Sequence, residues 1–427
     1  MLTPPRPLRY ARSISETDVK HDSNSASVPE PSVTRVTLLL FGITGVGFLP
    51  WFALSALGPT MIRDLEASAA LPGRLIGMLF LAAAVVSAVV GPSIDRFGTV
   101  PVVRGAFVVC ALSLGAMALA PSVPLLMAAV GVAGIALAVP MPATASVVAR
   151  RVAAPRRGAV IGVAQSGQQV GALLAGLALP WLAVTAGWRA SLMVAAGVAV
   201  LVGVTTTRGW PRAGVPGGLV GSNDRGRAPV WLLLYAGLMS TWTVSGVAFL
   251  PVTAAEVHAF DPRVAGSLVT VIGGVAILGK IGWGRAAGNA SRATTPALVL
   301  AMVAMVGLTV AALSDVIGPA AMWIAAVILG SSSLAWPVVT LALVARGVSS
   351  HRAGAVSGQV LAGGFIGSAT GPVAFGMVLE RFGFAAAWWT GVGVTLTAAA
   401  VLGVASRVTV FGTGENVEAS GVATDDT

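Results

Sequence analysis

Charged residues are scarce in this chain of 427 residues: Asp, Glu, Lys and Arg make up 10%, whereas apolar residues make up 56%. A soluble domain carries about 25% charged residues, so this chain lacks the polar groups needed to cover a surface in water. The shortage excludes a soluble enzyme, a disordered scaffold and a nucleic-acid-binding domain.

Residues that bind metals or form disulfides are also few. Cys110 is the single cysteine, which excludes a disulfide framework and a cysteine metal cluster. The three histidines, His21, His258 and His351, lie far apart in polar segments. We therefore expect no cofactor and no metal. An enzyme within the membrane would need grouped acids, histidines or a nucleophile with its base, and the apolar segments contain no such group, so we expect no enzyme.

Long apolar segments are abundant instead. Each is close to the ~20 residues that a helix needs to cross a bilayer, and the connections are too short for a soluble domain. The pattern predicts an all-α integral membrane protein with twelve transmembrane helices, at residues 36–59, 75–94, 102–120, 124–148, 158–183, 189–207, 229–252, 265–284, 296–313, 319–345, 355–378 and 386–405.

The same pattern predicts the domain organisation. Residues 1–33 and 407–427 are polar and are expected to be disordered cytoplasmic tails. The apolar segments divide into an N-terminal six-helix bundle at 34–207 and a C-terminal one at 229–406. Residues 208–228, rich in Gly, Pro and Arg, form the expected cytoplasmic linker between them.

The basic residues predict the orientation of the chain. Of the 26 Lys and Arg, 21 fall on the side shared by both termini, and the other side has only Arg63, Arg74, Arg189, Arg263 and Arg381. Because Lys and Arg concentrate in cytoplasmic loops, we expect a multi-pass protein of the cell (inner) membrane with both termini in the cytoplasm. The bilayer, including its anionic headgroups, is one expected partner.

The two halves also resemble each other when the sequence is shifted by 196 residues without a gap. Five glycines, Gly158, Gly162, Gly167, Gly171 and Gly187, then fall on Gly354, Gly358, Gly363, Gly367 and Gly383. An even number of helices in each half gives a parallel repeat. Such repeats place a substrate site near the membrane midplane, between the halves.

A loop motif connects these features to a known family. The stretch Gly91-Pro-Ser-Ile-Asp-Arg-Phe-Gly98 resembles the G-x-x-x-D-R-x-G loop of the major facilitator superfamily of secondary transporters, although the usual basic pair after it is missing. The resemblance covers about 34–406. Residues 156–171 together with Gly187-Trp-Arg189 are similar to the cyanate and nitroimidazole permease branch of that superfamily.

The resemblance implies gating roles for the loop. Asp95 would face the N-terminal end of the 355–378 helix, where unpaired N–H groups favour an anion, and Gly91 would let helices approach closely; Arg96 and Gly98 complete the motif. The alternative is a solvated Asp95 beside Arg96. Lys280, near the cytoplasmic end of its span, either extends its ammonium to the interface or attracts an anionic substrate and helps gating.

Helical phase places Gln165 and Gln169 on one face of the 158–183 segment, opposite the Gly167 and Gly171 ridge. We expect both amides to face the central passage, with Gln168 beside them; the alternative is a hydrogen bond to a neighbouring helix. Further candidates for substrate contact, for which packing or an interfacial belt is the alternative, are Trp51, Tyr235, Trp242, Trp336 and Gln359. The sequence also predicts interfacial belt positions for Trp188, Trp231, Trp388 and Trp389.

The expected function is transport of a small solute by alternating access, as a facilitative or secondary active carrier, and the resemblance favours a small organic anion as the substrate. No acid or histidine lies inside a span, so a carboxylate proton relay is not supported, and facilitated diffusion, exchange or protons carried by a weak acid stay open. One alternative is export of drugs, although Ala175 and Gly176 stand where proton-driven exporters of the superfamily carry their Gly-Pro signature. Another is a membrane sensor that binds a solute without moving it.

We expect no nucleic-acid partner; a monomer suffices for this function, but the oligomeric state stays open.

Overall fold

The computed structural model describes residues 32–153, 156–208, 227–291, 294–347 and 350–408. The expected tails and linker lie almost wholly outside these ranges. From Ser32 onward, the described residues belong to one compact unit.

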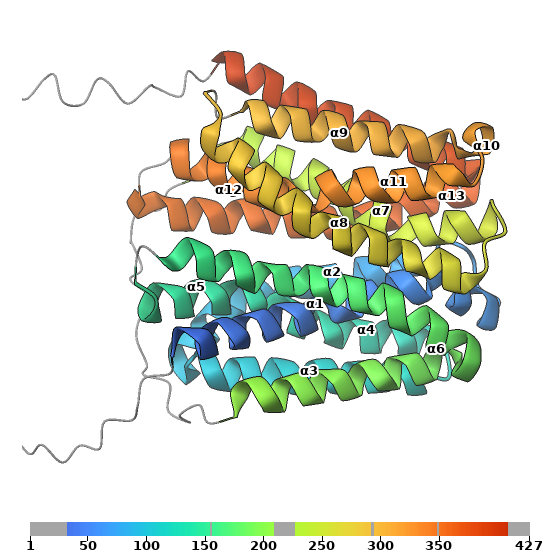
Figure 1. The fold of residues 1–427 in the computed structure, drawn as a ribbon, viewed down its shortest axis with the longest axis horizontal. Coiled ribbons are helices and arrows are strands. Elements are labelled where there is room, and N and C mark those ends of the chain that lie inside the picture. The colour runs from blue at the N-terminus through green and yellow to red at the C-terminus, as the bar shows by residue number, and fades with distance from the viewer. Residues whose placement is uncertain (1–31, 154–155, 209–226, 292–293, 348–349, 409–427) are drawn as a thin grey trace, which may run out of the picture. The chain divides into compact units, whose positions relative to one another are not determined.

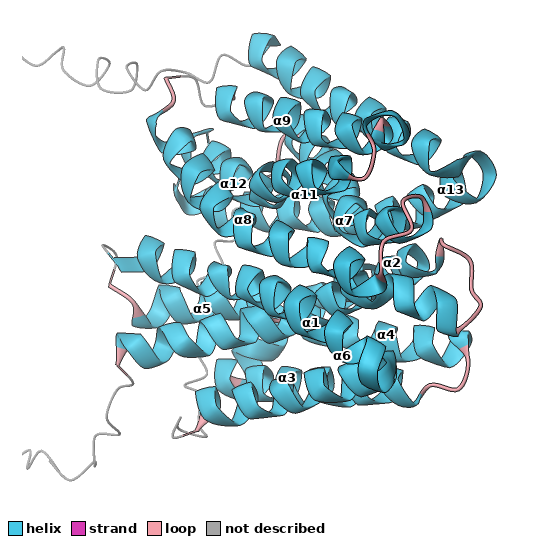
Figure 2. Ribbon diagram, turned by 45° about the vertical axis from the view of Figure 1, so that its right-hand side comes forward, coloured by secondary structure: helices cyan, strands magenta, loops and turns pink. Residues whose placement is uncertain are grey.

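The described residues form helices joined by short connections, without a strand among them (Figures 1 and 2). The helices are α1 (Val33–Asp64), α2 (Leu71–Phe97), α3 (Thr99–Leu119), α4 (Val123–Ala138), α5 (Pro140–Arg151), α6 (Arg157–Thr207), α7 (Val230–Glu256), α8 (Pro262–Asn289), α9 (Thr295–Ala312), α10 (Ser314–Ile317), α11 (Ala320–Ser332), the 3-10 turn η2 (Ser333–Ala335), α12 (Trp336–Gly347) and α13 (Ser350–Val408).

Ten helical segments of the described chain are long and apolar enough to cross a membrane. Two of them, in α6 and α13, are interrupted by glycines with positive φ, Gly187 (φ 84°) and Gly383 (φ 85°). A straight helix of 51 residues would be about 76 Å long, more than twice the ~30 Å hydrocarbon core. Since α6 and α13 each contain two crossing lengths, the fold is consistent with the expected twelve crossings. The two glycines are 196 residues apart, which is the register of the repeat.

Large apolar side chains are exposed along the outer faces of many helices, including Val85 on α2, Leu112 on α3, Leu201 on α6 and Leu278 on α8. In water such a surface would be unstable, whereas lipid solvates it. The buried face of α1 is nearly continuous from Leu39 to Met61, so α1 lies inside the bundle.

Two of the expected belt tryptophans are instead part of the interior. The indole of Trp188 is buried and donates to Asp64 Oδ2 at 2.6 Å, and the indole of Trp388 is buried and donates to Thr253 Oγ1 at 3.1 Å. The belt prediction is wrong for both, because each indole N–H finds a protein acceptor and needs no interfacial water. Trp389 is about half exposed, as a belt residue would be.

The charged side chains gather at the two ends of the helices. We call one end the basic end; it includes Arg96, Arg150, Arg151, Arg285 and Arg346. The other, called the opposite end, includes Arg63, Asp64, Arg74, Arg189 and Glu380. Figure 1 shows the helices running side by side between these two ends.

Candidate functional site

A cationic cluster lies where α8 crosses α6. Lys280 of α8 donates from Nζ to Gln169 Oε1 at 3.0 Å and to Gln168 Oε1 at 3.3 Å, both on α6. Among the described residues, these two amides are the polar partners of the ammonium, and no carboxylate pairs with it. We call Lys280, Gln168 and Gln169 the Lys280 cluster.

Glycines on α8 bring the two helices close enough to form this cluster. A Cβ at Gly273 would lie 2.8 Å from Ala172 Cβ and 3.0 Å from Gln169 O. Two further glycines are still closer to the facing helix. A Cβ at Gly266 of α8 would meet Pro180 of α6, and a Cβ at Gly176 of α6 would meet Thr270 of α8. Lys280 follows Gly273 by seven residues, about two helical turns, so it lies on the same face of α8 and meets α6 where Gln169 is.

Lys280 lies well before the end of its helix. It precedes the end of α8 at Asn289 by nine residues, about 14 Å along the helix axis, and its ammonium donates to amides of α6. The amide contacts favour a role at the α6–α8 interface over extension of the ammonium toward the membrane surface.

The amides have spare hydrogen-bonding capacity. Gln169 is fully buried, and its Nε2 has no hydrogen-bond partner. Gln165, one turn earlier, donates from Nε2 to Met141 Sδ at 2.9 Å, a weak acceptor. The structure thus brings Gln169 to Lys280 but leaves Gln165 against α5. A buried amide without a partner is unfavourable, so the cluster is suited to receiving a ligand with oxygen acceptors.

The aromatic candidates lie elsewhere. Trp51 is buried on α1 against Phe80, and Trp242 is buried on α7 against Phe375; neither indole N–H has a partner. Tyr235 donates to Ala297 O of α9 at 2.9 Å.

Two remaining candidates also lie apart from the Lys280 cluster. Trp336 packs against Gly364 of α13, and Gln359 accepts from the backbone N–H of Ala228 at 2.8 Å. Neither of these contacts involves the Lys280 cluster, and the substrate role of both residues stays a prediction.

The loop-motif residues lie at the basic end. Asp95 accepts from Arg150 Nη2 of α5 at 3.2 Å, and its expected contact with the start of the 355–378 helix stays a prediction. Arg96 is exposed and lies over the Phe97 ring. Gly98 joins α2 to α3 with φ 84° and ψ 158°, a conformation that in practice only glycine adopts.

The expected close approach of a neighbouring helix at Gly91 does not occur in this structure, because a Cβ there would meet no atom within 4 Å. Gly358, on α13, is open in the same way. Close contact occurs at the other end of the same helices. There, Gly73 and Gly77 of α2 pack against Pro372 and Val373 of α13, and a Cβ at Gly376 would lie 2.9 Å from Ala70 Cβ.

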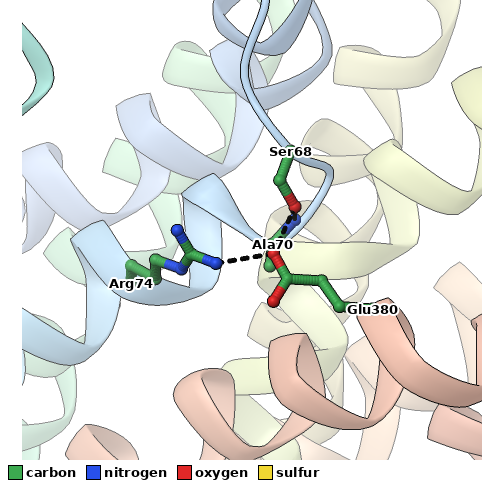
Figure 3. Close-up of polar contacts among 4 residues, drawn as sticks. All are labelled: Ser68, Ala70, Arg74 and Glu380. Carbon is green, nitrogen blue, oxygen red and sulfur yellow. Dashed lines mark hydrogen bonds and ion pairs between the residues drawn. The ribbon is translucent and has the colours of Figure 1, made fainter.

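An ion pair accompanies the contact of α2 with α13 at the opposite end (Figure 3). Glu380 Oε1 accepts from Arg74 Nη2 at 2.6 Å and from Ser68 Oγ at 2.5 Å, and Ser68 Oγ also accepts from the backbone N–H of Ala70. The hydrogen bond from Ser68, together with Arg74, holds the pKa of Glu380 below its usual value. This ion pair was not predicted from the sequence, where its only signal was an acid and a base in loops assigned to the same side.

The described residues contain no group of three or more His, Cys, Asp or Glu that could hold a metal ion. The candidate site is a cation with two amides between α6 and α8. The neighbouring helices α2 and α13 touch at the opposite end and leave Gly91 and Gly358 open at the basic end.

Comparison with known proteins gives consistent results. Residues 39–372 match the family model described as Major Facilitator Superfamily. Among curated proteins, none matches the sequence.

Several solved transporter structures resemble this one. A bacterial homolog of the human lysosomal transporter Spinster, inward-facing and occupied, has a TM-score of 0.73 at 18% identity, covering 88% of this chain and 97% of its own. The nucleoside transporter NupG has a TM-score of 0.69 at 14% identity, covering 86% of this chain and 99% of its own. A D-xylose-proton symporter has a TM-score of 0.68 at 12% identity, covering 87% of this chain and 96% of its own. At these identities the likeness concerns the fold alone.

Proposed function

Because the chain belongs to the major facilitator superfamily and is a multi-pass membrane transporter, not an enzyme, we propose that it carries a small organic anion across the cell membrane by alternating access. The anion binds at the Lys280 cluster. The single observation that carries this assignment is an ammonium between two amides without a carboxylate partner among the described residues.

The chemistry of the cluster suits a carboxylate. An ammonium forms short, charge-assisted hydrogen bonds to carboxylate oxygens, and amide N–H groups can orient such a group. The unpartnered Nε2 of Gln169 supplies one such donor. One cation favours an anion with one charge, because a second charge would remain unneutralised in a medium of low dielectric.

The glycines of α2 and α13 support the alternating motion. Gly73 and Gly91 are 18 residues apart on α2, and so are Gly358 and Gly376 on α13. Eighteen residues make five turns, about 27 Å, so each helix has small residues on one face at both ends. Contact at Gly73 and Gly376 closes the opposite end here, and contact at Gly91 and Gly358 would close the basic end in the other state.

The bundles at 34–207 and 229–406 are the moving parts in this proposal. The excess of Lys and Arg makes the basic end cytoplasmic, so the arrangement described above is inward-facing. Asp95 would exchange Arg150 for the start of α13 when the basic end closes.

Flux in proteoliposomes tests the function. The purified full chain is reconstituted, and counterflow of radiolabelled pyruvate is measured for the wild type and for Lys280→Gln. Arg285→Gln is the matched control, because it removes the same charge five residues along the same helix. Saturable counterflow that is lost in Lys280→Gln and kept in Arg285→Gln supports the proposal. Binding of pyruvate without flux would make the protein a sensor, and equal flux in Lys280→Gln would remove the cluster from the site.

A further inference from the structure

The Lys280 cluster has a consequence for energy coupling, which rests on the function proposed above. We propose that the carrier changes orientation only when Lys280 is neutralised, either by a bound anion or by loss of its proton. Exchange of anions then moves no proton, whereas net transport moves one proton with each anion in the same direction.

Whether the ammonium is neutralised depends on the groups that surround it. The helices that pack against α8 are α1, α6, α7, α9, α11 and α12, together with η2. Of these, α9, α11 and η2 contain no charged or titratable side chain. The remaining groups, including those of α8 itself, are Arg35, Arg63 and Asp64 on α1, Arg157 and Arg189 on α6, Tyr235 and Glu256 on α7, Arg263 and Arg285 on α8, and Arg346 on α12.

None of these groups neutralises Lys280. Asp64 pairs with Arg189 at 2.9 Å at the opposite end, and Glu256 ends α7 at that same end. Tyr235 donates to Ala297 O. The nearest cation along α8, Arg285, has the same sign as Lys280. Gln168 and Gln169 solvate the ammonium but carry no charge.

The alternating motion also changes the exposure of the ammonium to water. In this structure the cluster lies on the side of the Gly273 contact that faces the basic end, where Gly91 and Gly358 are open. Closing the basic end removes water from that side. An ammonium that loses water without gaining a counter-charge is strongly disfavoured, whereas a neutral amine or an ammonium–carboxylate pair is not.

The proton balance follows from these two states. On the outside, protonated Lys280 binds the anion, and the neutral pair crosses. On the inside the anion leaves, and the ammonium gives its proton to water as the N–H bond breaks. The neutral amine returns empty and takes a proton from outside water, so one anion and one proton have entered.

A test without any substrate uses spin labels at Ser93→Cys of α2 and Ser357→Cys of α13, in a Cys110→Ala background. The distance distribution across the basic end is measured in nanodiscs up to alkaline pH, starting above the range in which Glu380 titrates. For the wild type, the closed population rises about tenfold per pH unit while Lys280 is mostly protonated, since closing then releases one proton. Lys280→Arg stays open at every pH, because arginine keeps its charge, and Lys280→Gln closes to the same extent at every pH. His351→Gln, near the label on α13, must leave the wild-type response unchanged.

The flux arm uses pyruvate in the same preparations. In Lys280→Arg, the ratio of uptake driven by a pH gradient to counterflow falls more than tenfold below the wild-type ratio, about 1.4 kcal/mol by the usual conversion. A wild-type distance distribution that does not respond to pH, or an equal response in Lys280→Arg, overturns the inference. A pH response that requires Lys280, without any pyruvate flux, would instead refute pyruvate as a substrate and leave the charge rule standing.

Discussion

Gly73→Ala offers the most direct test of how the opposite end closes. The added Cβ would clash with Pro372 O of α13 and with the Phe249 ring. A backbone carbonyl has no rotamer by which to move away, so α2 and α13 must separate. Overpacking of this kind costs about 1–3 kcal/mol. Since 1.4 kcal/mol is a factor of ten, the closed population should fall about 5- to 150-fold relative to the open one.

The matched control is Gly91→Ala, five turns further on the same face of α2. Its Cβ meets nothing within 4 Å in this state, but it would clash if Gly91 contacts α13 when the basic end closes. Replacing glycine by alanine adds the same helix propensity, about 1 kcal/mol, at both positions. The two variants should therefore shift the equilibrium in opposite directions.

Spin labels at Arg63→Cys and Phe382→Cys, both exposed, report the distance across the opposite end. Gly73→Ala should lengthen this distance, and Gly91→Ala should leave the short distance at least as populated as in the wild type. A short distance retained in Gly73→Ala would refute the reasoning, because the clash would then be absorbed without separating the helices.

Three further outcomes are expected. The hydrogen bond from Ser68 lowers the pKa of Glu380 most, and Arg74 lowers it further. These contacts therefore stabilise the state closed at the opposite end at pH values above the pKa of the free carboxyl, and the stabilisation is lost as the pH falls through the lowered pKa of Glu380. Because the pair is exposed, its contribution is about 0.2–1 kcal/mol; acid should shift the same labels toward the open state by up to about fivefold, and Glu380→Gln should abolish the response. Gly187→Ala should lower the melting temperature in detergent, because an alanine at φ 84° is strained by about 1–3 kcal/mol; an unchanged melting temperature would contradict the break in α6. Asp95→Asn should insert normally but lose most flux in proteoliposomes, and full flux would exclude a gating role.

Composition and periodicity were sufficient for much of the fold. Apolar segments of bilayer length gave the crossings, because lipid selects for side chains without charge. The repeat register placed Gly187 and Gly383 at matching positions, and the structure breaks α6 and α13 at both. Gly98 was expected in a loop, and its backbone angles explain why only glycine fits there.

The neighbours of each side chain were decided by the tertiary structure alone. Helical phase put Gln165 and Gln169 on one face, but phase identifies a direction and not the helix that lies there. Of these two glutamines, Gln169 alone meets Lys280, because Gly273 brings α8 close to α6 at that level. The ion pair of Arg74 with Glu380 joins residues 306 positions apart, and no local pattern encodes such a distance. The sequence therefore determined that the chain crosses a membrane many times, and helix packing decided that Lys280 lies against the amides of α6.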